Sequence, residues 1–437
     1  MKRKISVLLI FVLALGIVFG AVNANNAEAK TKTTAATVTG KAMKITKKAK
    51  LNSDQMTKGY NLFSLKTLKE TLKEEEAGKN VMISPASLMF ALDMAAMGAQ
   101  GETYTQMANL LATGANKRDL INFAKTYRKT LEKSGLMKIA NSIWINENNL
   151  KENNVKINEE YLNLLRKVFK AAAASREFND TVKNEINSWI SKHTNKMINN
   201  AVDRLDDKTI MLIINCMAFE GKWETPYEDY QINKDGWFTN YAGKLEKAKM
   251  LSSEENWYLS SDTAQGFLKY YEGGKYAFMA MLPDDDSISI NDYVASLSDD
   301  AFVKFFESRV REEVDTVTPA FTFDYGINMN DMLQALGMEK PFDLSADFLK
   351  MLDPTTINPN IALYIGNVIQ KTHIELDENG TKAAAVTIIE MKCEATCVEP
   401  VKIKKKVILN RPFAFAIMDT ETGTPVFTGV VNTVAEK

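Results

Sequence analysis

Residues 378–387 read Glu-Asn-Gly-Thr-Lys-Ala-Ala-Ala-Val-Thr and follow a strand-like apolar stretch over residues 362–376. Gly380 is a natural hinge, because glycine adopts backbone angles that are closed to other residues. Glu378 precedes this hinge, and Thr381 follows it together with three small side chains, Ala383, Ala384 and Ala385. Such small side chains pack with little steric resistance, so the segment is typical of neither an ordinary core strand nor an ordinary loop.

Alternate residues after the hinge fall into two chemically different sets. Side chains in a β-strand point to opposite faces with a period of two residues. One face carries no charge and consists of Thr381, Ala383, Ala385, Thr387, Ile389, Met391 and Cys393. The other face carries four charges and consists of Lys382, Ala384, Val386, Ile388, Glu390, Lys392 and Glu394. The pattern predicts a half-buried strand, and it leaves open whether the strand is permanent or is an exposed loop that inserts later.

The rest of the chain predicts helices first and strands afterwards. Apolar spacing predicts helices over residues 60–76, 84–96, 105–111, 120–133, 158–174 and 184–199. Ser84 can cap the second of these, with Pro85 in its first turn. Apolar runs predict strands over residues 210–219, 276–282, 316–323, 362–376, 402–409, 413–418 and 426–431. Segregated helices and strands indicate one large α+β domain, which we place at residues 53–437.

Composition excludes several classes of protein. The 437 residues are 45% hydrophobic and 25% charged, which is ordinary for a globular chain and excludes a disordered or coiled-coil protein. The net charge of −1 gives no general attraction to nucleic acid. Three cysteines and two histidines are too few for a disulfide framework or a structural zinc site. We expect His193 on a solvated helix face and a structural role for His373, and we find no catalytic, metal-binding or cofactor-binding motif.

The first 52 residues predict a targeting segment and a linker. A basic cap, Lys2-Arg3-Lys4, precedes an uncharged apolar run over residues 5–22, and small residues follow it. This order predicts a cleaved secretory signal over residues 1–29, with an uncleaved membrane anchor as the alternative. Residues 30–52 predict a flexible basic linker, because residues 30–50 hold seven lysines and no acid. The linker could touch an anionic cell surface, although a solubilising spacer is favoured.

Two charged clusters have a functional and a structural interpretation. A basic helix face would suit a polyanion, although a solvated face is favoured; its members are Lys117, Arg118, Lys125, Arg128 and Lys129. Three aspartates at residues 284–286 would suit a cation, although a charged turn after Pro283 is favoured. Cys216 lies in an apolar strand and is predicted to be buried.

Several distant motifs together carry a family resemblance. The sequence motifs lie at residues 80–88, 97–103, 186–190, 215–223, 336–342, 410–413 and 427–429, and the last two include Asn-Arg-Pro-Phe and Phe-Thr-Gly. Each motif is only moderately specific, but their order and spacing make the match specific. The chain resembles a serpin along nearly all of residues 53–434, and residues 378–387 resemble the start of a serpin reactive-centre loop.

The resemblance implies a fold of eight to nine helices around three β-sheets, with the loop exposed. It also implies a secreted, monomeric, single-use inhibitor of serine endopeptidases rather than an enzyme. A target protease would cut the loop and form an acyl-enzyme, and the loop would then insert into the central sheet with its hinge near Gly380. A cysteine protease is an alternative target. A non-inhibitory binding or storage protein is the alternative function.

The resemblance also suggests which bond is cut. The usual family spacing puts the scissile residue fourteen positions after the hinge glycine, at the Glu394–Ala395 bond. The alternative is the Lys392–Cys393 bond, which would suit a trypsin-like protease. Cys393 and Cys397 flank the first bond, and in an extended strand they are about 13 Å apart, too far for a disulfide. A compact loop would allow a disulfide that acts as a redox lock, but two free thiols are favoured.

Two departures from the family pattern concern the opening of the sheet. Serpins usually pair the serines corresponding to Ser84 and Ser87 with an asparagine, here Asn215, and with a histidine. The matching histidine position holds Gln370, which predicts a shutter that does not respond to pH. The usual basic partner of Glu378 follows a proline, but here Ala320 follows Pro319, which predicts that this ion pair is absent. After the loop, Lys402, Lys404, Lys405 and Lys406 could attract an acidic protease or protect an edge strand from pairing.

Overall fold

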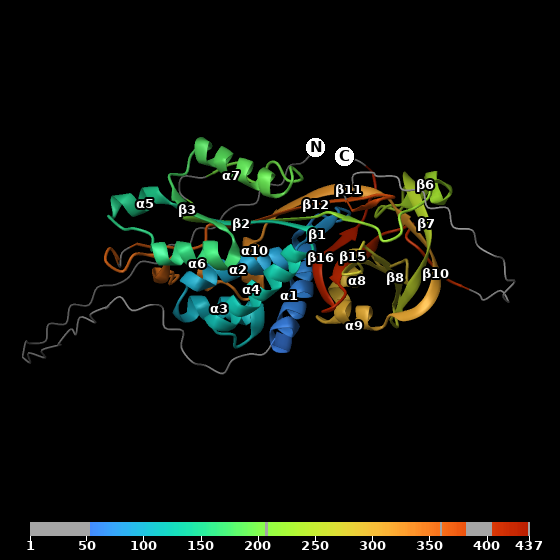
Figure 1. The fold of residues 1–437 in the computed structure, drawn as a ribbon, viewed down its shortest axis with the longest axis horizontal. Helices are drawn as coiled ribbons and strands as arrows, with labels where there is room; N and C mark the ends of the chain where they lie inside the picture. The colour runs from blue at the N-terminus through green and yellow to red at the C-terminus, as the bar shows by residue number, and fades with distance from the viewer. Residues whose placement is uncertain (1–52, 206–208, 359–360, 382–403, 436–437) are drawn as a thin grey trace, which may run out of the picture. The chain divides into compact units, whose positions relative to one another are not determined.

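The computed structural model describes residues 53–205, 209–358, 361–381 and 404–435 (Figure 1). Within these residues the predicted α+β fold is confirmed: ten α-helices pack around one seven-stranded and one nine-stranded β-sheet. The family resemblance implies three sheets. Two of them are joined here because β7 (Leu245–Ser260) is one continuous strand: it pairs with β6 near its start, with β10 from Met250 to Tyr258, and with β8 at its end.

The seven-stranded sheet holds the segment that leads into the loop. Its strands are β2 (Met137–Asn146), β3 (Ala172–Arg176), β4 (Met211–Phe219), β5 (Gly221–Lys222), β11 (Phe321–Asn328), β12 (Asn367–Leu376) and β13 (Gly380–Thr381). Their order is β3-β2-β4-β12-β13-β5, and β11 pairs with β12. The neighbours β4 and β12 run parallel, whereas β2 and β11 run antiparallel to them.

The nine-stranded sheet carries the segment that follows the loop. Its strands are β1 (Val81–Ile83), β6 (Ile232–Thr239), β7, β8 (Ala264–Tyr270), β9 (Tyr276–Pro283), β10 (Val310–Pro319), β14 (Lys405–Ile408), β15 (Phe413–Asp419) and β16 (Thr424–Val431). β14 lies at one end of the strand order and pairs with β10 in parallel register. Two of the predicted lysines, Lys405 and Lys406, are exposed on this edge strand, where their charge opposes pairing with another chain.

Helices cover both faces of the seven-stranded sheet. The helices of the described residues are α1 (Ser53–Glu74), α2 (Pro85–Gly98), α3 (Gly101–Ala112), α4 (Lys117–Lys133), α5 (Glu147–Glu152), α6 (Glu159–Phe169), α7 (Asp180–His193), α8 (Ile290–Ser296), α9 (Ala301–Glu307) and α10 (Asn330–Ala335), of which α8 and α9 contact the nine-stranded sheet instead. Apolar residues of α7 pack on β2 and β4, and α2, which is buried along its whole length, lies against the opposite face (Figure 1). Strand β4 is therefore buried at every residue, as expected for a strand covered on both sides.

Several predicted elements have different boundaries. The helix predicted over residues 158–174 ends at Phe169, because Lys170 adopts a left-handed backbone angle and the chain then enters β3. The helix predicted over residues 184–199 is α7, which begins at Asp180 and ends at His193. The strand predicted over residues 316–323 is two strands that meet at Ala320, and the one predicted over residues 362–376 begins only at Asn367. Among the longer strands, β2, β6, β7 and β8 were not predicted.

No helix among the described residues has the length and apolar character needed to cross a membrane.

Candidate functional site

The central seam of the seven-stranded sheet is the contact between β4 and β12. Their parallel register runs from Leu212 opposite Asn367 to Ala218 opposite His373. Both strands continue past this paired region. Strand β12 runs on to Leu376, and the chain that leaves β4 continues into β5. The two strands therefore form one closed seam that stops before their ends.

The loop begins between the ends of these two strands. Thr381 pairs with Leu376 of β12 on one side and with Gly221 of β5 on the other. Gly380 pairs with Lys222 in the same antiparallel register. The first two residues after the turn thus occupy a strand position between β12 and the continuation of β4. The seam is already open at this end by the width of one strand.

The predicted hinge glycine is required by a close backbone contact. A Cβ atom placed on Gly380 would lie 2.1 Å from the carbonyl oxygen of Gly221 and 2.7 Å from the Cα of Lys222. Real Cβ atoms do not approach a carbonyl oxygen this closely, so any other residue would push β13 away from β5. The turn before it is held by Asp377, whose carboxylate accepts the backbone N–H groups of Asn379 and Gly380.

An aromatic cluster that was not predicted holds the start of the loop. The Thr381 side chain is 1% exposed, and its hydroxyl lies 2.7 Å from the hydroxyl of Tyr271. Burial raises the pKa of Tyr271 well above its ordinary value, although this hydrogen bond acts against the shift. Trp223 stacks on Tyr271 with ring centres 4.5 Å apart, and its indole N–H donates to the carbonyl oxygen of Asp377 at 2.8 Å. The sequence motif at residues 215–223 includes this tryptophan but does not reveal its contacts.

Glu378 does have a cationic partner, although it is not at residue 320, where the family's usual partner was predicted to be absent. Lys249 of β7 donates to the Glu378 carboxylate at 2.5 Å. The carbonyl oxygen of Lys249 also accepts the backbone N–H of Ala320. Lys249 therefore lies on the neighbouring strand, directly opposite residue 320, the usual position of the basic partner in the family. Partial burial opposes ionisation of Glu378, but the hydrogen bond and charge of Lys249 outweigh it and lower its pKa.

The four predicted shutter residues do meet behind the seam. The side-chain amide of Gln370 donates to Asn215 Oδ1 at 2.8 Å and to the carbonyl oxygen of Ser84 at 2.9 Å, and its oxygen accepts the Ser84 N–H at 3.1 Å. Ser84 Oγ in turn accepts the N–H of Ser87 and caps α2. All four residues are fully buried. The glutamine therefore takes the place of a histidine without adding a group that titrates near neutral pH.

A fifth polar residue completes this cluster. Asn141 of β2 lies opposite Asn215, which lies opposite Gln370, so the three amides form one row across β2, β4 and β12. The Ser87 hydroxyl donates to Asn141 Oδ1 at 2.9 Å. The Nδ2 of Asn215 has no hydrogen-bond partner among the described residues, although it is buried. Asn141 was missed because β2 was not recognised as a strand.

The remaining predicted residues lie elsewhere or outside the described part of the chain. Residues 382–403 are not described, so Ala383, Ala384, Ala385, Lys392, Cys393, Glu394, Ala395, Cys397 and Lys402 have no observed position. Cys216 is buried as predicted, and burial raises the pKa of its thiol to about 12. His193 is exposed, and His373 lies 2.7 Å from the Asp324 carboxylate. Within the described ranges, no three potential metal ligands gather at residues 284–286 or elsewhere.

The five cations that could have formed a polyanion face, for which a solvated face was favoured, do not all point to solvent on α4: Lys125 and Lys129 are exposed, but two others turn inward. Arg128 is only 4% exposed, its Nε donates to the carbonyl oxygen of Val168 at 3.0 Å, and its guanidinium pairs with Glu132. Lys117 turns inward and donates to two carbonyl oxygens at the end of α2, those of Met97 and Ala99. Burial, together with the charge of Lys350, lowers the pKa of Lys117 to about 8. Two of the five cations are thus used to cap and anchor helices.

Comparisons with known proteins agree with this architecture. The family model described as Serpin (serine protease inhibitor) matches residues 58–434. Neuroserpin of Homo sapiens is 26% identical over 369 residues, which cover 81% of this chain and 86% of neuroserpin. The thermophilic serpin tengpin in its native state is 34% identical with a TM-score of 0.79, and covers 89% of this chain and 96% of its own.

The same tengpin in its latent state gives a TM-score of 0.73 at 32% identity, with 89% of this chain and 100% of that chain covered. Human thyroxine-binding globulin, solved as a complex with thyroxine, shares the fold at 20% identity and a TM-score of 0.75, with 88% of this chain and 100% of that chain covered.

Proposed function

The chain belongs to the serpin family, whose members are mostly protease inhibitors, and from this membership we propose that it is a single-use inhibitor of serine endopeptidases. Thyroxine-binding globulin shares the fold, so the fold alone does not carry inhibition. The observation that carries the proposal is the position of Gly380 and Thr381 between the end of β12 and the continuation of β4.

The proposed reaction uses the chemistry of the protease. The protease serine oxygen attacks the carbonyl carbon of the scissile residue, and the serine proton passes to the departing amine. The peptide bond breaks, an ester joins the two proteins, and the chain beyond the cut is released as a new N-terminus. The segment that begins at Gly380 can then enter the sheet and carry the attached protease with it before water hydrolyses the ester.

The observed register specifies where each inserted residue would lie. Thr381 pairs with both Leu376 and Gly221, so antiparallel pairing continues with residue 383 between Ile374 and Phe219. Residue 385 then meets Thr372 and Met217, and residue 387 meets Gln370 and Asn215. These last pairs are consistent with one another, because β4 and β12 already set Gln370 opposite Asn215 and Thr372 opposite Met217.

The same register specifies which loop face enters the core. Residues directly opposite each other on neighbouring strands share a face of the sheet. The partners on β12 are all buried: Leu376, Ile374, Thr372 and Gln370. Thr381, Ala383, Ala385 and Thr387 would therefore face inward, and this is the set of loop residues that carries no charge. A small uncharged face meets little steric or desolvation resistance on entry.

Insertion would exchange one contact of the shutter for another. A strand that brings Thr387 between Asn215 and Gln370 must break their 2.8 Å hydrogen bond. The buried Asn215 Nδ2 now has no partner among the described residues, and a buried unpaired donor is costly. The Thr387 hydroxyl would offer it an acceptor. The closed seam thus holds an unsatisfied group that insertion can satisfy, as expected of a fold whose native state stores energy.

We further propose Glu394–Ala395 as the cut bond, with Lys392–Cys393 as the alternative, and two free thiols at Cys393 and Cys397. Glu394 suits a protease with a basic specificity pocket. The proposed domain limits remain a signal over residues 1–29, a basic linker over residues 30–52 and the inhibitory domain over residues 53–437, with secretion or, alternatively, anchoring by an uncleaved signal. N-terminal sequencing of the protein recovered from the culture medium tests these limits.

A cleavage experiment tests the insertion step without knowledge of the target. A low amount of a non-target protease cuts the loop, and the unfolding temperatures of the cut and intact proteins are compared by circular dichroism. We expect the cut protein to unfold at a much higher temperature, because the freed segment completes the sheet. An unchanged or lower temperature would refute insertion and leave a non-inhibitory serpin.

A further inference from the structure

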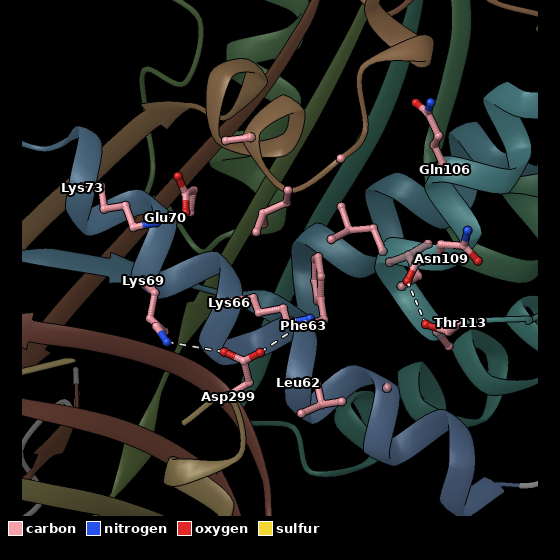
Figure 2. Close-up of a pocket in the computed structure, with 17 residues that line it drawn as sticks. Leu62, Phe63, Lys66, Lys69, Glu70, Lys73, Gln106, Asn109, Thr113 and Asp299 are labelled. Carbon is pink, nitrogen blue, oxygen red and sulfur yellow. Dashed lines mark hydrogen bonds and ion pairs between the residues drawn. The ribbon is translucent and has the colours of Figure 1, made fainter. Parts of the chain in front are cut away.

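A groove away from the seam has the features of a ligand site (Figure 2). It lies between α1, α3 and the turn that follows α10, and its volume is about 580 Å³. This volume falls within the range of small-molecule sites. None of the residues that line it belongs to β4, β12 or β13, so the groove is separate from the proposed inhibitory machinery.

The floor of the groove is apolar. Leu62, Leu110 and Leu336 line it and are each half-buried, so part of each side chain remains accessible. Phe63 and Ala112 lie buried beneath them. Helices α1 and α3 and the turn after α10 thus each contribute apolar atoms, which could take further apolar atoms out of water, while Gln106, Asn109 and Thr113 make another part of the lining polar.

One wall of the groove is a row of lysines. Lys66, Lys69 and Lys73 lie three and four residues apart and share one face of α1 (Figure 2). Two carboxylates face them: Asp299 lies 3.6 Å from Lys66 and 3.5 Å from Lys69, and Glu70 pairs with Lys73 at 2.7 Å. Three cations against two carboxylates leave one positive charge without a counter-charge. This excess is local, because residues 51–437 carry 44 basic and 54 acidic side chains.

Lys66 has the weakest existing contact of the three cations, because Lys73, although more exposed, is held by Glu70 at 2.7 Å. Lys69 also donates to the carbonyl oxygen of Leu297 at 2.7 Å, and its side chain is only 20% exposed. Lys66 is 44% exposed, and it shares the Asp299 carboxylate with Lys69 at a distance longer than a hydrogen bond. Figure 2 shows both lysines reaching toward the same carboxylate.

We propose that this groove binds a fatty acid, with the acyl chain on the leucine floor and the carboxylate at Lys66. Charge complementarity favours an anionic ligand, because the carboxylate of the ligand would supply the counter-charge that Asp299 and Glu70 leave missing. The basic linker over residues 30–50 has no acidic side chain and does not meet this requirement. A neutral or cationic amphiphile would gain the apolar contact but would lose the contact with Lys66.

Titration calorimetry on the whole protein with dodecanoate, below its micelle concentration, tests the proposal. Lys66→Gln removes the proposed head-group contact, and Ala335→Trp fills the groove from an exposed position on α10. Lys58→Gln is the matched control, because Lys58 is exposed on α1 but does not line the groove. Dodecanol and dodecyltrimethylammonium test the choice of charge. Unfolding temperatures show that each variant is folded.

We expect saturable binding of about one dodecanoate, weakened roughly tenfold by K66Q and lost in A335W, with less than a twofold change in K58Q. The two other amphiphiles should bind at least tenfold more weakly than dodecanoate. Absence of saturable binding, equal effects of K58Q and K66Q, or preferred binding of the cation would each overturn the proposal. Protease trapping by K66Q should equal that of the unmodified protein, so failure here is distinct from failure of the proposed inhibition.

Discussion

A carboxylate at residue 385 should convert the protein from an inhibitor into a substrate. The extended register sets this residue beside Thr372 and Met217, whose side chains are 1% and 0% exposed. A glutamate would lose its hydration on insertion, which costs several kcal/mol. If about 4 kcal/mol of this cost appears in the barrier, insertion slows roughly a thousandfold, since each 1.36 kcal/mol is a factor of ten. Water would then hydrolyse the acyl-enzyme first.

The assay is the number of inhibitor molecules consumed for each protease molecule inactivated. Ala385→Glu should raise this ratio by more than an order of magnitude and give cut inhibitor in place of the covalent complex on denaturing gels. Ala384→Glu is the matched control, because the register turns residue 384 to the other face, beside Ala218 and the half-buried His373, whose imidazole can hydrogen-bond a carboxylate. Normal trapping by A385E, or an equal loss in A384E, would refute the assignment of the inward face.

Three further predictions concern the ends and the middle of the seam. Gln370→His should make the unfolding free energy depend on pH, because burial lowers the folded-state pKa of an imidazole. The unfolding free energy should fall by roughly 1 kcal/mol per pH unit as the pH is lowered from 7 to 5. An unfolding free energy that does not change with pH would contradict this. Gly380→Ala forces a Cβ against the Gly221 carbonyl and should lower the unfolding free energy by about 1–3 kcal/mol in urea titrations; an unchanged midpoint would argue against the close contact. Glu378→Gln should remove a stabilisation that is present above the ordinary glutamate pKa and is lost as pH falls through the lower folded-state pKa. The variant and the unmodified protein should therefore differ in unfolding temperature at pH 7 and converge in acid, below the ordinary glutamate pKa.

The fold class and the buried core were predictable because they follow from apolar periodicity. Strand β7 was missed because its sequence alternates weakly and is rich in charged residues, which are tolerated where burial along the strand is only partial. The break at Ala320 was missed because only the backbone turn separates two strands of similar composition. The early end of α6 depends on the left-handed backbone angle of Lys170. No glycine or asparagine marks this position in the sequence, so the angle could not be predicted.

Four polar residues at the seam were identified from the sequence, but other residues of the site and most of its contacts were not. Ser84, Ser87, Asn215 and Gln370 were identified through family motifs, and the structure brings them together. The ion pair between Lys249 and Glu378 could not be predicted from the sequence, because the two residues lie 129 positions apart and meet only through strand pairing. The same reason hides Tyr271 and Asn141, whose roles depend on which residues lie opposite them.

Covalent trapping of a protease tests the central claim most directly. The mature protein is incubated, with loop thiols both reduced and oxidised, with glutamate-specific, trypsin-like, chymotrypsin-like and subtilisin-like proteases and separated on denaturing gels. The account predicts a complex that survives denaturation with at least one of them, and a released fragment that begins at Ala395 or, for a trypsin-like target, at Cys393. Cleavage of the loop by every protease, with full protease activity retained and no complex, would contradict it.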